Sequence, residues 1–217
     1  GSHGRVDRGR SGGMSTAVTN PSPFEAARQA AVGKAIQVTL SNISQYGRFL
    51  HPGAQPWRKG VEVARDIAWR EARGGDSHLL DVYRPEGVEG PLPVMVYVHG
   101  GGFRILSKDS HWMFGCGFAK RGFVVFNVNY TLSTSAPYPA AIKDVCTAFQ
   151  WIVANAATYG GDLGRLAFAG ESAGANLALG LMIACCWRRP EPWAQAVWRL
   201  GHTPDVVLPA CGFNQVS

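Results

Sequence analysis

The stretch LAFAGESAGAN, residues 166–176, decides the fold class of this chain. It joins a short apolar strand to an apolar helix through the turn GESAG, which follows the pattern G-x-S-x-G around Ser172. A serine on such a strand-to-helix turn projects its hydroxyl outward, and Gly170 and Gly174 allow the crowded backbone to pack closely. The helix N-terminus beneath the serine favours developing negative charge. This context predicts a nucleophilic serine on an α/β scaffold.

A second glycine-rich motif, HGGGF at residues 99–103, follows an apolar run at residues 94–98. Its three glycines leave backbone N–H groups unscreened. Attack by serine on an ester builds an oxyanion, and each donor fixed beforehand at that oxyanion contributes ~10²–10³ in rate. A phosphate-binding loop or a plain flexible turn would be the alternative, but the spacing fits neither common phosphate-binding motif. We therefore expect an oxyanion hole in this loop.

Strand-like and helix-like segments alternate on both sides of the two motifs. Short β-rich runs predict strands at residues 61–69, 79–83, 94–98, 123–128, 166–169 and 206–210, with helices at residues 138–158 and 173–187. The uniformly apolar run at 94–98 is typical of a strand covered on both faces. This order predicts an α/β fold with a mostly parallel sheet flanked by helices.

The chain divides into three parts. Residues 1–13, GSHGRVDRGRSGG, have the character of a cleaved tag and linker ahead of Met14. Residues 14–60 are an N-terminal helical segment, in which residues 21–50 have few helix breakers and a loose helical repeat of apolar side chains that predicts one or two helices. Residues 61–217 contain both motifs and form the expected α/β core.

The composition favours a globular domain and excludes several other classes. The 217 residues are 46% hydrophobic and 17% charged, and the net charge of +6 is not gathered into a run of Lys or Arg, so nucleic acid is not an expected partner. No secretory signal follows Met14, which favours a cytoplasmic location. Residues 177–187 are too few for the ~20 that span a membrane, so no membrane span is expected. The five cysteines show no C-x-x-C spacing, which favours free buried thiols over disulfides or a zinc site.

Four segments together resemble the hormone-sensitive-lipase-like group of α/β-hydrolase carboxylesterases and lipases: HGGGF, NVNYTLS (127–133), PYPAA (137–141) and YGGDLGRLAFAGESAGAN (159–176). The resemblance spans roughly residues 61–213. It implies the α/β-hydrolase fold, Ser172 as nucleophile, and the N–H groups of Gly101, Gly102 and Ala173 as the oxyanion hole. It also implies that residues 14–60 form part of a lid over the acyl pocket, and that no metal or other cofactor takes part.

The serine also needs a base and a carboxylate, which in this fold follow it in the order Asp or Glu, then His. Beyond Ser172 the chain contains one histidine, His202, and it precedes the only nearby aspartate, Asp205, which reverses the expected order. Both precede the strand at 206–210, more than ~15 Å from a serine at the far end of a parallel neighbour. His51, His78, His99 and His111 lie upstream; a convergent arrangement with His111 stays open.

The chain ends directly after its last strand, where two further strands are expected. We therefore expect this to be the N-terminal portion of a longer esterase, with the catalytic Asp and His on a segment absent from this chain. That segment could be a second polypeptide that completes the fold and covers an exposed apolar edge at 206–210.

The remaining polar residues near the motifs have simpler explanations. Asp162 and Arg165 are expected to form an ion pair that pins a turn. His99 is expected to be a packed, hydrogen-bonded loop residue. Glu171 stays open between electrostatic tuning of the site and a solvated or hydrogen-bonded place in the turn.

These observations predict a carboxylic-ester hydrolase that works through an acyl-enzyme on Ser172. Its partner is a small-molecule ester with a small to medium acyl group. Hydrolysis of amides or formamides is possible within the same chemistry. A ligand-binding module that has lost the catalytic histidine is the alternative from another class.

Overall fold

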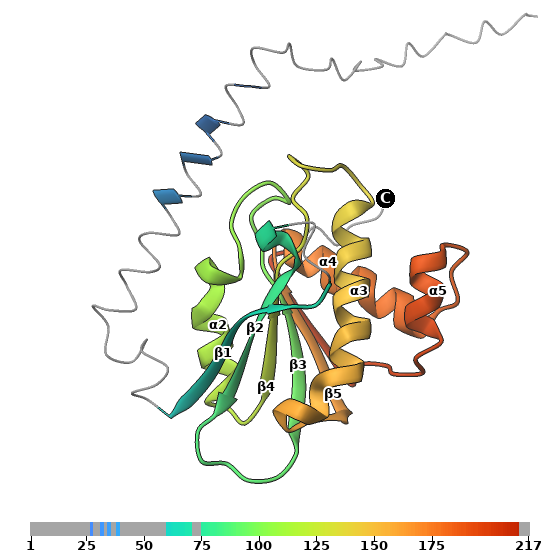
Figure 1. Cartoon of the computed structure of the whole chain (residues 1–217). Helices are drawn as coiled ribbons and strands as arrows, with labels where there is room; N and C mark the ends of the chain where they lie inside the picture. Colours follow the sequence, from blue (N-terminus) through green and yellow to red (C-terminus); the bar gives the residue numbers. More distant parts are fainter. Residues whose placement is uncertain are drawn as a thin grey trace, which may run out of the picture.

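The computed structural model describes residues 60–70 and 75–212, together with the helical positions 27, 31, 32, 34, 35, 38 and 39 (Figure 1). Its centre is a six-stranded sheet in the order β1-β2-β4-β3-β5-β6. The strands are β1 (Val61–Ala68), β2 (Leu79–Pro85), β3 (Leu92–Val98), β4 (Val124–Val128), β5 (Gly161–Glu171) and β6 (Val206–Ala210). Each of the six predicted strands is present: the bounds of β6 match, those of β1 and β4 differ by one residue, and those of β2, β3 and β5 differ by two or more.

The sheet is mixed. Strands β4, β3, β5 and β6 pair in parallel, whereas β1 pairs antiparallel with β2 and β2 antiparallel with β4. The prediction of a mostly parallel sheet therefore holds for the half that carries both motifs. The first two strands differ because only residues 69–78 connect β1 to β2, and a parallel crossover needs a dozen residues or more.

Helices cover both faces of the sheet. Figure 1 shows α2 (Trp112–Ala119) on one side and α3 (Ala140–Asn155), α4 (Ala173–Cys186) and α5 (Pro192–Trp198) on the other. Alternate residues of β3 enter different cores: Val94 and Val96 pack beneath α3 and α4, while Met95 and Tyr97 pack beneath α2. The prediction that this strand is covered on both faces is confirmed. Three short 3₁₀ helices complete the described elements: η3 (Gly75–His78), η4 (Lys108–His111) and η5 (Ala156–Tyr159).

The two long helices were predicted, whereas α2 and α5 were not. The segment WMFGCGFA of α2 contains two glycines and lacks a clear helical repeat, and its Trp112, Cys116 and Ala119 pack against the sheet. Helix α5 is seven residues long and starts at a proline, which is a favoured first helical residue but also a breaker signal in sequence.

The predicted N-terminal parts lie largely outside the described residues. The described positions between 27 and 39 are helical and exposed, as a helix in the 14–60 segment requires. The proposed tag at residues 1–13 and the terminal residues 213–217 fall outside. None of the helices in the described ranges is both long and apolar enough for a membrane crossing.

All five cysteines are free, as expected, but their burial differs. Cys116, Cys146 and Cys185 are buried, and burial raises the pKa of the Cys116 thiol to about 11. Cys186 and Cys211 are exposed, so the prediction of buried thiols is wrong for these two. Cys186 is the last residue of α4, and Cys211 directly follows β6.

Candidate active site

Ser172 occupies a strained turn between β5 and α4. Its φ of 53° and ψ of −117° lie outside the conformations that L-residues ordinarily adopt. Two glycines permit the turn: a Cβ on Gly174 would overlap the carbonyl oxygen of Val98 and lie 2.7 Å from that of His99, and one on Gly170 would overlap the backbone of Gly174. The expected role of both glycines in close packing is confirmed.

The loop after β3 holds its glycines in conformations that other residues rarely adopt. Gly101 has a φ of 113° and Gly102 a φ of 59°. The carbonyl of Gly101 accepts hydrogen bonds from the amides of Arg104 (3.0 Å) and Ile105 (3.1 Å), which close the loop on itself. Among the described residues, the N–H groups of Gly101, Gly102 and Ala173 donate no hydrogen bond. These three amides are available to an incoming acceptor.

The loop and the turn are in direct contact. A Cβ on Gly100 would overlap the Glu171 carboxylate and lie 2.7 Å from the Glu171 carbonyl oxygen. The residue before Ser172 therefore packs against the residue before Gly101. This contact places the two motifs, far apart in sequence, at one site at the carboxyl ends of β3 and β5.

His111 contacts Glu171 and not the serine. Its Nε2 lies 3.2 Å from Oε1 of Glu171, and within the described part of the chain no histidine forms a hydrogen bond with Ser172. The question left open for Glu171 is thus answered in structural terms: its carboxylate is a hydrogen-bonded partner of His111. Sequence reasoning missed this pair because no local pattern connects residues sixty positions apart.

His99 is a packed loop residue, as predicted. It is 1% exposed, its ring stacks on Tyr130 at 4.4 Å between centroids, and its Nδ1 lies 2.7 Å from the carbonyl oxygen of Gly100. Burial, followed by the proximity of His111, lowers the pKa of His99 to about 3. The ring is therefore neutral at ordinary pH.

The other described histidines lie away from the serine. His78 faces Asp144 on α3, with 3.6 Å between Nε2 and Oδ2. The Asp205 carboxylate accepts a hydrogen bond from the amide of Leu166 at 2.8 Å, whereas Ser172 bonds to Ala210 at the opposite end of β6. The predicted separation of His202 and Asp205 from Ser172 is therefore confirmed by the strand register. His51 lies outside the described residues.

The Asp162 and Arg165 side chains form the predicted ion pair, with 2.8 Å between the carboxylate and Nε. The hydrogen bond from Arg165 lowers the pKa of Asp162. Nowhere in residues 60–70 and 75–212 do three His, Cys, Asp or Glu side chains gather as a possible metal site.

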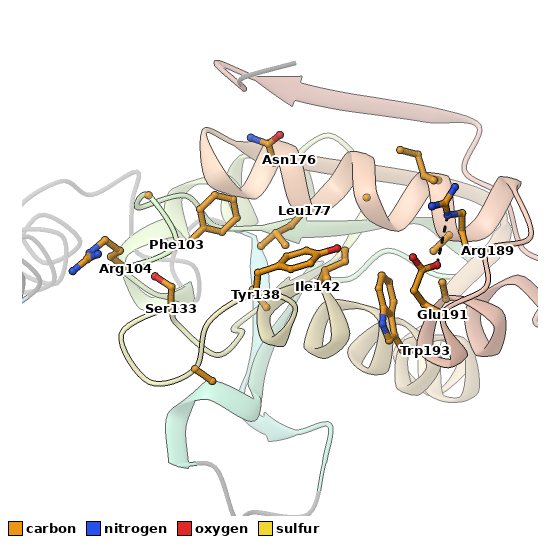
Figure 2. A pocket seen from close by; sticks show the side chains of 17 residues that line it. Phe103, Arg104, Ser133, Tyr138, Ile142, Asn176, Leu177, Arg189, Glu191 and Trp193 are labelled. Atoms are coloured by element: carbon orange, nitrogen blue, oxygen red, sulfur yellow. Dashed lines mark ion pairs between the residues drawn. The ribbon is translucent and has the colours of Figure 1, made fainter. Parts of the chain in front are cut away.

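A groove of about 690 Å³ runs from the HGGG loop along the space between α3 and α4 (Figure 2). Gly102 and Phe103 line one end, and Trp193 lines the other, next to an ion pair between Arg189 and Glu191. Most of the wall is apolar and includes Tyr138, Ala141, Ile142, Leu177, Gly180, Ile183 and Ala184. The groove therefore offers an apolar surface directly beside the loop of free amides.

Comparison with known proteins shows that this chain is similar to esterases. Residues 80–186 match the family model BD-FAE. Carboxylesterase NlhH of Mycobacterium tuberculosis is 38% identical over 171 residues, which cover 70% of this chain and 54% of that protein. The esterase LipW of Mycobacterium marinum is 34% identical with a TM-score of 0.55, over 68% of this chain and 46% of that one.

Esterase B of Lactobacillus rhamnosis shares only 18% identity, but its TM-score of 0.70 over 87% of this chain and 58% of that one shows the same fold. The chain spans about half the length of the curated relatives it matches. Residues 80–186, which hold the GESAG turn and the HGGG loop, are a BD-FAE domain of the hormone-sensitive-lipase-like esterase family.

Proposed function

We propose that this chain carries the nucleophile and the oxyanion hole of a carboxylesterase. The direct contact between Gly100 and Glu171 is the observation that carries the proposal, because it joins the HGGG loop to the turn that holds Ser172. Ser172 attacks the ester carbonyl, and its proton passes to a base. The N–H groups of Gly101, Gly102 and Ala173 stabilise the oxyanion. The alcohol leaves, and water hydrolyses the acyl-enzyme.

The base and its orienting carboxylate come, in this proposal, from outside the described residues. Serine is a weak nucleophile without a base. His78, His99 and His111 have other partners, and His202 lies at the far end of β6. The curated relatives are longer than this chain, which supports a further segment that carries the Asp and the His. In this proposal the segment belongs either to the same polypeptide or to a second one.

The groove supports esters with small to medium apolar acyl groups as substrates. Its apolar wall begins at Gly102, so an acyl group bound there extends from the oxyanion hole along α3 and α4. Burial of each CH₂ contributes about 0.8 kcal/mol to binding. The scheme assigns no step to a metal or an organic cofactor.

The test uses the full-length protein and p-nitrophenyl butyrate. Ser172→Ala is expected to reduce kcat/KM at least ~10³-fold, because the nucleophile is lost. Ser135→Ala, in an exposed turn, is the matched control and is expected to retain activity. A Ser172→Ala enzyme that keeps most of its activity would contradict the proposal. The matching p-nitroanilide measures the amide alternative in the same assay.

A ligand-binding module is the second candidate, favoured by the lack of a histidine bonded to Ser172 among the described residues. It predicts that the full-length protein binds butyrate esters without hydrolysing them. Calorimetric binding with no release of p-nitrophenol over hours would support this candidate.

A further inference from the structure

The carboxylate of Glu171 lies on the oxyanion loop. This side chain follows Ala167 and Ala169 along β5, on the sheet face that packs against α2. Its Oε1 and its Cδ both occupy the space that a Cβ on Gly100 would need, and Cδ is 2.7 Å from that position. The loop therefore cannot move toward β5 without displacing the carboxylate. This contact gives Glu171 a direct mechanical link to the proposed oxyanion hole.

His111 holds the carboxylate from the other side. Its Nδ1 lies 3.1 Å from the carbonyl oxygen of Ser107 and 2.9 Å from the hydroxyl of Ser110, which itself donates to that carbonyl. Since the Ser107 carbonyl only accepts, Nδ1 carries a proton. Nε2 faces Oε1 of Glu171 at 3.2 Å, so a proton between these two atoms completes a hydrogen bond. This contact joins the segment at residues 107–111 to the turn that carries Ser172.

The surroundings protect this pair from solvent. The His111 side chain is 7% exposed and that of Glu171 32%. The ring of His111 stacks on Phe114 at 5.8 Å between centroids and lies 6.2 Å from Tyr97 and 5.6 Å from the neutral His99. Partial burial reduces dielectric screening, so the hydrogen bond between the ring and the carboxylate is stronger than at an exposed surface.

The element that carries His111 is firmly attached to the sheet. In η4, Lys108 is 1% exposed, and its Nζ forms ion pairs with Asp81 at 2.9 Å and Asp66 at 2.6 Å. Its backbone N–H donates to Asn129 at 2.6 Å, and its carbonyl accepts from Asn127 at 3.0 Å. His111 therefore projects from a firmly held helical turn, and its contact with Glu171 restrains the Glu171 side chain.

We infer that Glu171 and His111 are a positioning pair, which acts through Gly100 to hold the amides of Gly101 and Gly102 in register with Ser172. This inference rests on the proposed function. Neither residue touches the substrate in this role. Donors that are ordered before the reaction stabilise the oxyanion most, and a displacement of ~1 Å costs about 10²-fold in rate. The pair maintains that order.

The kinetic test compares Glu171→Gln, which removes the charge at nearly constant size, with Asp162→Asn. The control makes the same chemical change in an ion pair of the same strand that is remote from the loop. In the full-length enzyme, Glu171→Gln is expected to lower kcat about 10- to 100-fold with KM within about twofold. His111→Gln should act alike, and the double variant should be no worse than the more severe single one.

A second measurement does not depend on turnover. Hydrogen exchange, followed by mass spectrometry in a Ser172→Ala background, reports on the peptide that contains Arg104 and Ile105, whose amides close the loop by donating to the Gly101 carbonyl. Loss of the pair is expected to speed exchange there at least about fivefold relative to Asp162→Asn. If Glu171→Gln does not fold, His111→Gln removes the pair from the other side.

The two measurements separate the two ideas. An inactive wild-type protein with faster loop exchange in Glu171→Gln contradicts the proposed function and leaves the positioning contact in place. Unchanged exchange, or unchanged kcat in an active enzyme, overturns the positioning pair.

Discussion

Gly101 is constrained by two features of its surroundings. Its φ of 113° disfavours any other residue, and a Cβ there would overlap the carbonyl oxygen of Ile105 and approach the Cβ of Leu106 at 3.2 Å. The overlap is with backbone, which cannot rotate away. A side chain at this position must therefore deform the loop that presents the amides.

Gly101→Val is expected to lower kcat and kcat/KM together by ~10²–10³, because the lost interaction exists only in the transition state. Gly87→Val is the matched control: Gly87 also has a positive φ, of 67°, but has open space around its Cα, and it lies in a remote turn. Steady-state kinetics on p-nitrophenyl butyrate distinguish the two. If Gly101→Val folds and keeps its kcat, the loop has another purpose.

The sequence alone predicted the glycines and the serine, since the backbone conformation that requires them involves only neighbouring residues. The G-x-S-x-G pattern and the HGGG run each express a backbone requirement within five residues. The partner of Glu171 was out of reach, because His111 meets it only after β3, η4 and β5 have assembled. Long-range side-chain pairs of this kind carry no signal in a single sequence.

Small residues on the facing sides of α3 and α4 leave the space that forms the groove between the two helices. Gly180 is central to this spacing: a Cβ there would lie 2.9 Å from Cδ1 of Ile142 on the facing helix. Ala141 and Ala184 add further short side chains to the wall. The width of the groove is therefore set by the sizes of a few residues.

Gly180→Leu is expected to fill this space and to shorten the longest acyl chain that the enzyme accepts. The ratio of kcat/KM for p-nitrophenyl octanoate to that for the acetate should fall at least about tenfold, since several buried CH₂ groups lose their contacts. Gly117→Leu in α2, where a Cβ would meet only Arg121 at 3.9 Å, controls for the change in helix propensity. An unchanged ratio would show that the acyl group binds elsewhere.

Elements with strong patterns were predictable, and those shaped by tertiary contacts were not. The apolar runs of β3, β4 and α4 indicated burial on their own. The antiparallel pairing of β2 with β4 depends on strand order, which periodicity does not encode. Helix α2 is stabilised by its position on Met95, Tyr97 and Val125, and not by its own sequence.

The order of strands leaves β6 at one edge of the whole sheet. Val206 is 45% exposed and Leu208 43%, although both belong to an apolar strand. The expected exposure of apolar side chains on this strand is confirmed. Edges of this kind readily pair with another segment, which supports the proposal that a further segment completes the site.

The stability of the molecule is expected to fall with acidification because of one buried ring. The pKa of His99 is about 3 in the folded chain and 6.5 in the unfolded one, so only the unfolded chain gains a proton below pH 6.5. The free energy of unfolding therefore decreases as pH falls from 6.5 towards 3, by about 1 kcal/mol between pH 6.5 and about 5.5.

Urea unfolding of the wild type and of His99→Asn at these two pH values checks this expectation. The variant should lose most of that dependence, whereas His202→Asn should keep it. An identical slope in wild type and His99→Asn would argue against a neutral buried ring.

The hydrogen bond from the Ser172 amide to the carbonyl of Ala210, at 2.8 Å, determines how a division of the protein into two complementing fragments affects the serine. A division within residues 199–205 puts the serine and the strand that holds it on separate pieces. Reassembly of the pieces would then be needed to restore the serine's backbone, and ester turnover would report on reassembly. A division in the exposed turn at residues 86–91 keeps serine and strand on one piece, and it is the natural reference for such a reporter.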